Sequence, residues 1–324
     1  MYYLNSKHIQ SIPRDWDQLA LVIEEAVSCM GNEDFAQPVK PYLRYRNLQN
    51  RIIAMPAFIG GQINFSGIKW IASFPGNLEK GEKRAHSVSI LNEADTGIPR
   101  CMINTPIISG IRTAAVTGAV IKKVMEARGT EQKDLIAGMT GFGPIGQLHL
   151  EMLQAILGNN LKEVRIFDIR PFDELAGARQ TISGVRPVST FEEASDGVDI
   201  FITATVSDKP YFNRPPKPGS LHLNVSLRDY VPDFMDFVDL MIVDDWDEVC
   251  REKTDIEMMA IHKGLKKEDT VNLVDVFCNG ALNRLDQNEV VMFNPMGMAV
   301  FDIAIGAWYY EKAKELAICT ILED

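Results

Sequence analysis

The chain has 324 residues, of which 46% are hydrophobic and 24% are charged, and its 33 Lys and Arg residues against 44 Asp and Glu residues give a net charge of −11. This composition excludes a disordered chain, and the excess of acidic side chains disfavours binding to nucleic acid. Charged residues interrupt the apolar stretches before they reach the roughly 18 residues that a membrane span needs. We therefore expect a soluble protein of about two domains that binds neither nucleic acid nor membrane.

The N-terminus lacks the basic segment, apolar run and small-residue cleavage site of a secretory signal. The five cysteines are odd in number and dispersed, and neither they nor the five histidines have the spacing of a metal site. Dispersed thiols suit a reducing compartment. The sequence thus predicts a cytoplasmic protein without a bound metal.

The first third of the chain predicts one helix followed by short strands. Residues 17–31 carry apolar side chains at helical spacing and end in glycine. The segments "RIIAMPAF" (51–58), "FSGIKWIASF" (65–74) and "HSVSILNE" (86–93) read as strands separated by turn residues. Residues 108–129 then predict a long helix, rich in alanine, that connects this part to the next.

From about residue 135 the pattern changes to alternating strands and helices. Strands are predicted at 134–139, 163–168, 198–205, 221–226 and 238–245, with helices at 144–157 and 172–182. Such alternation indicates parallel βαβ units covered on both faces. Residues 296–318 predict a long amphipathic helix with no strand after it, and we infer that it packs on the N-terminal part. The α/β domain is therefore expected as an insertion in another domain.

A glycine-rich turn directly follows the first strand of this α/β part and opens a helix. The motif "GFGPIG" predicts five cofactor-binding residues, Gly141, Gly143, Pro144, Ile145 and Gly146. The next strand ends in Asp168, which can accept hydrogen bonds from a ribose hydroxyl and favours NAD over NADP, although Arg170 weakens that preference. The alternative is an ordinary turn of an α/β protein. The glycine turn after a strand, the helix that it opens and the acid at the end of the next strand together predict a Rossmann domain that binds NAD.

Later strand ends add polar candidates, because ligands of such sheets bind beyond the carboxyl ends of the strands. These cofactor-binding candidates are Thr205, Asn224 and Ser226. Gly297 is a further one, since a glycine lets the backbone approach the nicotinamide.

Several cations gather in the N-terminal part of this acidic chain. They are Lys40, Arg44, Lys69, Arg84 and Arg112. Lys69 stands inside an apolar strand, where its side chain either extends to water or points into a polar cleft. In a cleft, burial would lower its pKa, and the amine could donate or accept a proton. For the arginines, surface salt bridges are the alternative.

Motifs from both parts of the chain resemble the ornithine cyclodeaminase/μ-crystallin family across essentially its whole length. They are "RIIAMP", "SGIKWI", "ADTGIP", "ISGIRTAA", "GFGPIG", "TATVSDKP", "IVDDWDEVCRE" and "NPMGMAVFDIA". The resemblance implies a Rossmann NAD domain (114–299) inserted in an α+β substrate and dimerisation domain made from both chain ends (1–113 and 300–324). It also implies a homodimer.

The resemblance assigns roles by position. Arg44, Lys69 and Arg112 match the family's substrate-carboxylate and acid/base positions, Thr113 matches a phosphate contact, and Asp229 matches the catalytic aspartate. Two departures concern the substrate. Ile53 replaces an acid of the cyclodeaminases, which disfavours ornithine, and Asp233 stands four residues after Asp229, where the cyclodeaminases have a lysine. In addition, Arg84 in place of a neutral residue, together with Lys40, favours an anionic substrate.

Within the family, "KPYLR", "DDW", "REK" and "NPMGMA" are most similar to dehydrogenases acting on N-(2-amino-2-carboxyethyl)-L-glutamate. The implied reaction is NAD-dependent oxidation and hydrolysis to L-2,3-diaminopropionate and 2-oxoglutarate, for siderophore or antibiotic biosynthesis. Lys69 and Asp229 would be catalytic. Two alternatives stay open: an ornithine or lysine cyclodeaminase or imine reductase, and a non-catalytic NAD(P)-dependent binding protein like μ-crystallin.

Overall fold

The computed structural model describes residues 1–129, 134–171 and 184–323. They form two compact units, one made of Met1–Val116 with Met298–Asp324 and the other of Thr117–Gly297. The boundaries predicted from the sequence are 113/114 and 299/300. The roles predicted for the two parts, substrate and dimer formation for one and NAD binding for the other, stay predictions.

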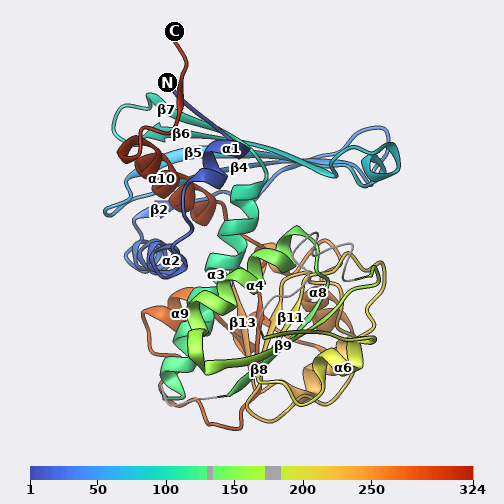
Figure 1. Cartoon of the computed structure of the whole chain (residues 1–324). Coiled ribbons are helices and arrows are strands. Elements are labelled where there is room, and N and C mark those ends of the chain that lie inside the picture. The colour runs from blue at the N-terminus through green and yellow to red at the C-terminus, as the bar shows by residue number, and fades with distance from the viewer. Residues whose placement is uncertain (130–133, 172–183, 324) are drawn as a thin grey trace. The chain divides into compact units, whose positions relative to one another are not determined.

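The first unit contains a mainly antiparallel sheet. Its strands are β1 (Tyr2–Asn5), β2 (Phe35–Ala36), β3 (Tyr42–Leu43), β4 (Arg51–Ile59), β5 (Phe65–Ser73), β6 (Ala85–Glu93), β7 (Pro99–Asn104) and β16 (Thr320–Ile321). Their order is β16-β1-β7-β6-β5-β4-β2, with β3 also pairing with β4. The two ends of the chain lie side by side because β1 pairs with β16 (Figure 1).

Helices cover one face of this sheet. They are α1 (Ser6–Ser11), α2 (Trp16–Gly31) and α10 (Ala299–Glu315). Two further helices belong to connections: the 3-10 helix η1 (Pro75–Lys80) lies between β5 and β6, and α3 (Ile107–Ala127) leads to the second unit. Asp15 caps α2 by accepting from the Gln18 N–H, and Leu19, Ile23 and Val27 bury its apolar stripe. As predicted, α10 packs on the N-terminal part, against β4, β5, β6 and α2 (Figure 1).

Two predictions about the C-terminal segment are wrong. The helix is not amphipathic, because every residue from Ala299 to Ala307 is buried. A helix enclosed by a sheet on one side and by α2 on another must be apolar all round. A strand also follows it: β16 pairs with β1. This two-residue strand is too short to produce a periodic signal in the sequence.

The second unit is built on a parallel sheet. Its strands are β8 (Leu135–Thr140), β9 (Leu161–Phe167), β10 (Val185–Pro187), β11 (Ile200–Thr203), β12 (Leu221–Asn224), β13 (Leu240–Val243), β14 (Thr270–Asn272) and β15 (Val291–Asn294). They are ordered β10-β9-β8-β11-β12-β15-β13-β14. The chain leaves β8 toward β9 and β10, then returns to place β11 on the other side of β8. The turn after β8 therefore lies at the topological switch point, where such sheets bind ligands.

The helices of the second unit include several short ones. They are α4 (Pro144–Leu157), η2 (Gly158–Asn160), α6 (Phe191–Ser195), η3 (Pro232–Phe237), α7 (Trp246–Val249), α8 (Asp255–Lys263), η4 (Lys267–Asp269) and α9 (Leu273–Phe277). The predicted fold class, a Rossmann unit inserted in an α+β unit, is confirmed. The helix predicted at 172–182 lies outside the described residues. No strand was predicted at the position of β15, which lies between β12 and β13 in the sheet.

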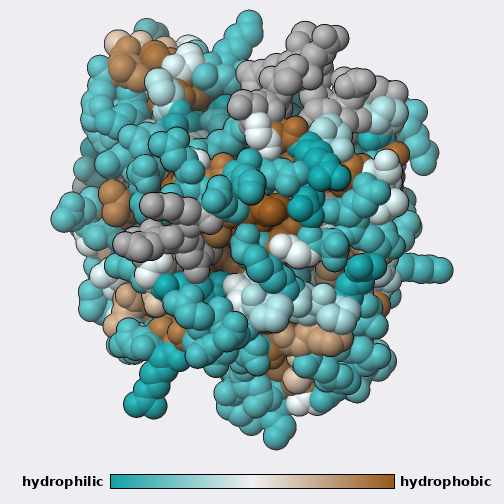
Figure 2. All heavy atoms as spheres, turned by 60° about the horizontal axis from the view of Figure 1, so that its bottom comes forward, coloured by the Kyte–Doolittle hydropathy of each residue, from teal (hydrophilic) through white to brown (hydrophobic). Residues whose placement is uncertain are grey.

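The surface of the molecule varies in hydropathy (Figure 2). The face drawn in Figure 2 is mostly hydrophilic, with small separate groups of hydrophobic side chains. In the part of the chain that the structure describes, no helix has both the length and the hydropathy needed to cross a bilayer.

Candidate functional site

Lys69 occupies the centre of the first unit. It lies in the middle of β5, opposite Met55 of β4 and Ser89 of β6. Because side chains alternate along a strand, Lys69 points to the face covered by α10 rather than to the opposite face. Only 2% of its surface is exposed. The side chain therefore does not extend to bulk water.

A carboxylate of α10 holds Lys69 and Arg112 together. Asp302 Oδ1 accepts from Lys69 Nζ at 2.9 Å and from Arg112 Nε at 3.0 Å. Lys69 Nζ also donates to Ser109 Oγ at 2.7 Å. The other carboxylate oxygen of Asp302, Oδ2, is buried without a hydrogen-bond partner among the described residues. Helices α3 and α10 thus bring their polar side chains to one strand residue.

The electrostatics of this cluster are dominated by burial. The pKa of Lys69 is lowered to about 8: burial is the largest cause, Asp302 opposes it, and Arg112 and Lys40 add to the lowering. Burial acts to raise the pKa of Asp302, but Arg112 and Lys69 outweigh it and hold that pKa below its ordinary value. An amine with a pKa near 8 can exchange a proton near neutral pH.

The remaining predicted residues of the first unit are placed differently. Lys40 is buried and close enough to act on Lys69. Arg44 lies in an exposed segment, with its guanidinium 5.4 Å from the centre of the Tyr42 ring. Arg84 is half-buried just before β6. Thr113 is half-buried on α3 and donates to the Ser109 carbonyl.

In the second unit, the three glycines of the motif have distinct steric surroundings. Gly141 has a φ of +87°, and a Cβ there would lie 2.5 Å from the Ala204 carbonyl oxygen. A Cβ on Gly146 would lie 2.2 Å from the Gly141 carbonyl oxygen. A Cβ on Gly143 would meet only Arg170, at 3.9 Å. Gly141 and Gly146 are thus required by packing, whereas the space before Gly143 is open, as a bound pyrophosphate would need.

Helix α4 begins at this turn. Gly143 is its N-cap residue and Pro144 its first residue, so no side chain caps the helix there. Ile145 follows, and its carbonyl oxygen lies 2.8 Å from His149 Nδ1. The helix N-terminus can therefore present its N–H groups to an anion.

Asp168 lies beside the same turn. Its Oδ2 accepts from the Phe142 N–H at 2.7 Å, and its Oδ1 accepts from Arg170 Nε at 3.1 Å. Burial acts to raise the pKa of Asp168, but its bonds with Arg170 and Phe142 hold it below the ordinary value. A cavity of about 420 Å³, lined by Asp168, Arg170 and Val188 among others, opens beyond β9 and β10. These features fit the ribose and base of a dinucleotide.

Asp229 is buried in the turn after β12. Its Oδ1 accepts from Thr205 Oγ1 at 2.5 Å, and its Oδ2 accepts from Ser226 Oγ. Burial raises the pKa of Asp229, although these hydroxyls oppose the shift. Two of the predicted cofactor-binding hydroxyls therefore bond to the predicted catalytic aspartate.

Asn224 and Gly297 are held by other buried acids. Asn224 Nδ2 donates to Asp255 and to Asn294, and the residue is fully buried. Its side chain thus belongs to the interior of the second unit. Gly297 has a φ of +93°, and its N–H donates to Asp244 Oδ2 at 2.6 Å. A glycine suits this left-handed conformation.

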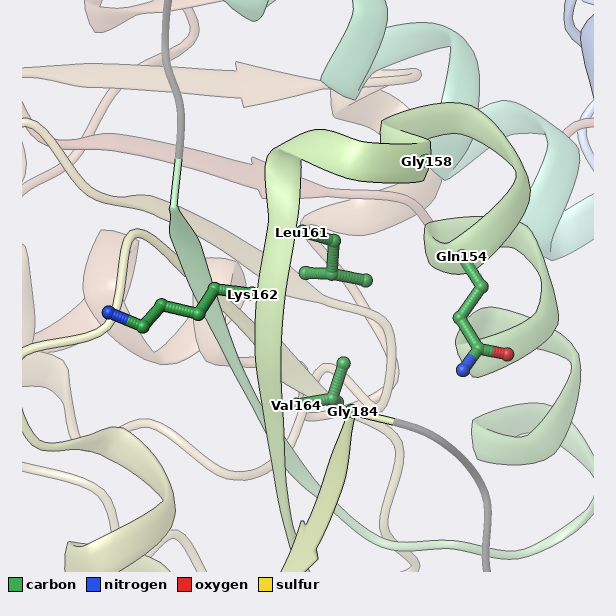
Figure 3. Close-up of a pocket in the computed structure, with 6 residues that line it drawn as sticks. All are labelled: Gln154, Gly158, Leu161, Lys162, Val164 and Gly184. Carbon is green, nitrogen blue, oxygen red and sulfur yellow. The ribbon is translucent and has the colours of Figure 1, made fainter.

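One further cavity is not part of the candidate site. A space of about 250 Å³ lies between the end of α4 and the first residues of β9, where Gln154 and Leu161 line it and Lys162 extends away from Gln154 (Figure 3). It is at the amino end of β9, whereas the glycine turn follows the carboxyl end of β8.

The acids that organise both clusters were not among the residues predicted from the sequence. Asp302 bonds to Lys69 and Arg112. Asp255, in the network of Asn224, was not singled out. A single acid inside the apolar run "AVFDIAIGAW" is the signal that could have identified Asp302.

Comparisons with known proteins agree with this architecture. The model of the ornithine cyclodeaminase/mu-crystallin family matches residues 7–316. The chain is 32% identical to N-((2S)-2-amino-2-carboxyethyl)-L-glutamate dehydrogenase of Staphylococcus aureus, covering 99% of this chain and 98% of the relative. It is 26% identical to alanine dehydrogenase of Archaeoglobus fulgidus, covering 92% and 90%. Thermococcus litoralis Delta(1)-pyrroline-2-carboxylate reductase, solved with NADH and L-proline, has the same fold, with a TM-score of 0.87, 20% identity and coverage of 99% and 100%.

Proposed function

Because this chain belongs to the ornithine cyclodeaminase/mu-crystallin family, we propose that it is an NAD-dependent dehydrogenase of N-(2-amino-2-carboxyethyl)-L-glutamate. The products are L-2,3-diaminopropionate and 2-oxoglutarate. The observation that carries the proposal is the buried cluster in which Lys69 and Arg112 share one carboxylate oxygen of Asp302, with Lys40 near enough to act electrostatically on Lys69. An excess of buried positive charge requires an anionic partner.

The substrate's three carboxylates match this excess. Arg112 bonds to Asp302 through Nε, so its terminal nitrogens can form a bidentate pair with the substrate α-carboxylate. Lys40, Arg44 and Arg84 would bind the other carboxylates. Ile53 shares the sheet face of Lys69, since its strand partner Ile71 is two residues from Lys69. An apolar side chain there provides no partner for the second amino group of ornithine.

The chain's own residues perform the proton steps. Bound NAD+ supplies the acceptor for the two electrons and the hydrogen that leave the glutamate Cα. The amine nitrogen loses a proton, which leaves a carbon–nitrogen double bond in the substrate. Asp229 would take a proton from the water that attacks this bond. Lys69 would be the second acid/base group of the reaction. Return of that proton from Asp229 to the nitrogen would let the carbon–nitrogen bond break, while the new hydroxyl loses its proton to become the keto oxygen of 2-oxoglutarate, and the diamine is released.

NAD would be held by residues of the second unit. Its pyrophosphate would lie against Gly143 and the first turn of α4, and its ribose would contact Asp168. Thr113 is a further proposed phosphate contact, and Gly297 would lie near the nicotinamide.

The direct test is turnover. The purified chain is incubated with NAD+ and the proposed amine while NADH absorbance and 2-oxoglutarate are measured. Formation of both in equal amounts supports the proposal. Turnover of ornithine, or of a cyclic imine with NADH, without turnover of this amine would instead identify a cyclodeaminase or reductase. NAD binding without any turnover would identify a binding protein.

Replacing Arg84 with alanine tests the anionic-substrate assignment. We expect KM to rise by about 10-fold or more, because a charge-assisted hydrogen bond contributes about 1.5–3 kcal/mol, while the Kd for NAD stays unchanged. Arg100→Ala is the control, since Arg100 is an exposed arginine of the same sheet that pairs with Glu93. Equal losses of substrate and NAD binding would remove Arg84 from the substrate site.

We also propose that the chain forms a homodimer through the sheet face opposite α10. Trp70 points to that face and is 44% exposed. Its neighbours there are apolar: Ala54, Pro56, Ile68, Val88 and Ile90.

Trp70→Glu should raise the dimer dissociation constant at least about 10-fold, as loss of a buried interface tryptophan does. Sedimentation velocity measures this, with Leu21→Glu on α2 as the control. A dimer unaffected by Trp70→Glu would exclude this face.

A further inference from the structure

Asp255, the first residue of α8, supports the turn that carries Asp229. Its Oδ2 accepts from the backbone N–H groups of Asp229 and Tyr230, both at 3.1 Å, and from Asn224 Nδ2 at 3.0 Å. Its own N–H donates to the Leu227 carbonyl at 2.8 Å. One residue, 2% exposed, therefore contacts the turn at four points.

The conformation of this turn depends on such contacts. Leu227 has a φ of +62°, a left-handed conformation that costs a non-glycine residue about 1–3 kcal/mol. Such a residue stays in place only where its surroundings over-determine it. The Leu227 N–H donates to Asn224 Oδ1, and Asn224 in turn bonds to Asp255. Asp255 thus fixes both ends of the strained segment.

Asp255 also interacts electrostatically with the Asp229 carboxylate. The two carboxylates repel each other electrostatically inside the unit, and this repulsion is among the causes that raise the pKa of Asp255. Burial is the largest cause and brings that pKa to about 7. The other ionisable groups that act on the pair are Tyr211, Tyr230 and Arg228. Tyr230 in turn is bonded to His222, a neutral partner because burial lowers the pKa of His222 to about 3.

We propose that Asp255 is a positioning residue for Asp229: it fixes the backbone of the 224–230 turn and so holds the Asp229 carboxyl in place. The inference rests on the proposed function, in which Asp229 accepts a proton. It adds a second acid that acts on the reaction through Asp229 and touches neither substrate nor NAD.

Asp255→Asn separates the charge from the geometry. An asparagine oxygen can still accept the backbone N–H groups of Asp229 and Tyr230, whereas the negative charge is lost. We expect Asp255→Asn to keep most of kcat and the position of its acid limb, because the amide oxygen still holds the turn and the Asp255 carboxyl is mostly protonated below its pKa of about 7. Asp255→Ala should lower kcat at every pH. Asp247→Asn, at an exposed acid of α7, is the control.

A titration of the protein itself makes the test independent of turnover. In protein labelled with ¹³C at aspartate carboxyls, the Asp229 midpoint should shift in Asp255→Ala, where the turn loses its acceptor, and stay in place in Asp255→Asn, with the signal assigned from Asp229→Asn. The Asp255 midpoint should fall in Asp229→Asn, because the charge of Asp229 is among the causes that raise it.

The outcomes distinguish the two proposals. An Asp229 midpoint that does not move in Asp255→Ala overturns the positioning role, whether or not the amine is turned over. A moved midpoint without turnover of the amine keeps the positioning role and contradicts the proposed reaction. A role for Asp255 in folding alone would lower the stability of Asp255→Ala and leave the Asp229 midpoint in place, which also overturns the proposal.

Discussion

Replacing Asp302 with alanine should lower the free energy of unfolding of the first unit by about 3–5 kcal/mol, the usual cost of removing one partner of a buried ion pair. Asp302 Oδ1 is the shared acceptor of Lys69 and Arg112, and all three side chains are buried. Without it, two cations stay in the interior with no carboxylate to balance them. Urea unfolding followed by tryptophan fluorescence measures the loss.

The pH dependence of this variant provides a second measure. Lys69 has a folded-state pKa of about 8 against an ordinary 10.5, so between these values the unfolded chain binds more protons and stability rises with pH. Loss of Asp302 lowers the folded pKa further, and the rise should begin at a lower pH. Glu93→Ala is the control, because that exposed pair with Arg100 contributes little. Equal stability of both variants would contradict the buried cluster.

Substituting the glycines of the turn should separate folding from NAD binding. In Gly146→Ala the new Cβ would lie 2.2 Å from the Gly141 carbonyl oxygen, so we expect lower thermal stability as well as weaker binding. In Gly143→Ala the Cβ enters open space, and Tm should be unchanged. The Kd for NAD should nevertheless rise at least about 10-fold, because the methyl group occupies the approach of the pyrophosphate.

Calorimetry of NAD binding and thermal unfolding without NAD test this pair. Gly76→Ala is a matched control, since no atom lies within 4 Å of a Cβ at that exposed glycine. Wild-type affinity in Gly143→Ala would argue against a pyrophosphate at this turn. Unchanged stability in Gly146→Ala would contradict the close packing of α4 on β8.

Local patterns predicted most of the long elements. The predicted helix at 144–157 coincides with α4, and the strand at 65–74 nearly coincides with β5, because hydrophobic periodicity and turn residues act over a few positions. Short or enclosed elements were harder to predict. Strand β16 has two residues, and α10 is apolar all round because it is enclosed by its neighbours in the fold.

The candidate site was only partly predictable. The cations Lys69 and Arg112 were chosen from the sequence, yet their shared partner was not. Asp302 is 233 residues from Lys69 and 190 from Arg112. No spacing rule relates positions so far apart. Asp255 likewise reaches Asp229 from a different helix.

By itself, the sequence determined the glycine turn, its position between a strand and a helix, and the excess of cations in an acidic chain, since each follows from neighbouring residues. Tertiary structure alone decided that Lys69 is buried, that Asp302 holds it, and that Thr205 and Ser226 bond to Asp229. The physical reason is that a side chain's charge state depends on burial and on its partners, and the folded chain draws these from distant segments.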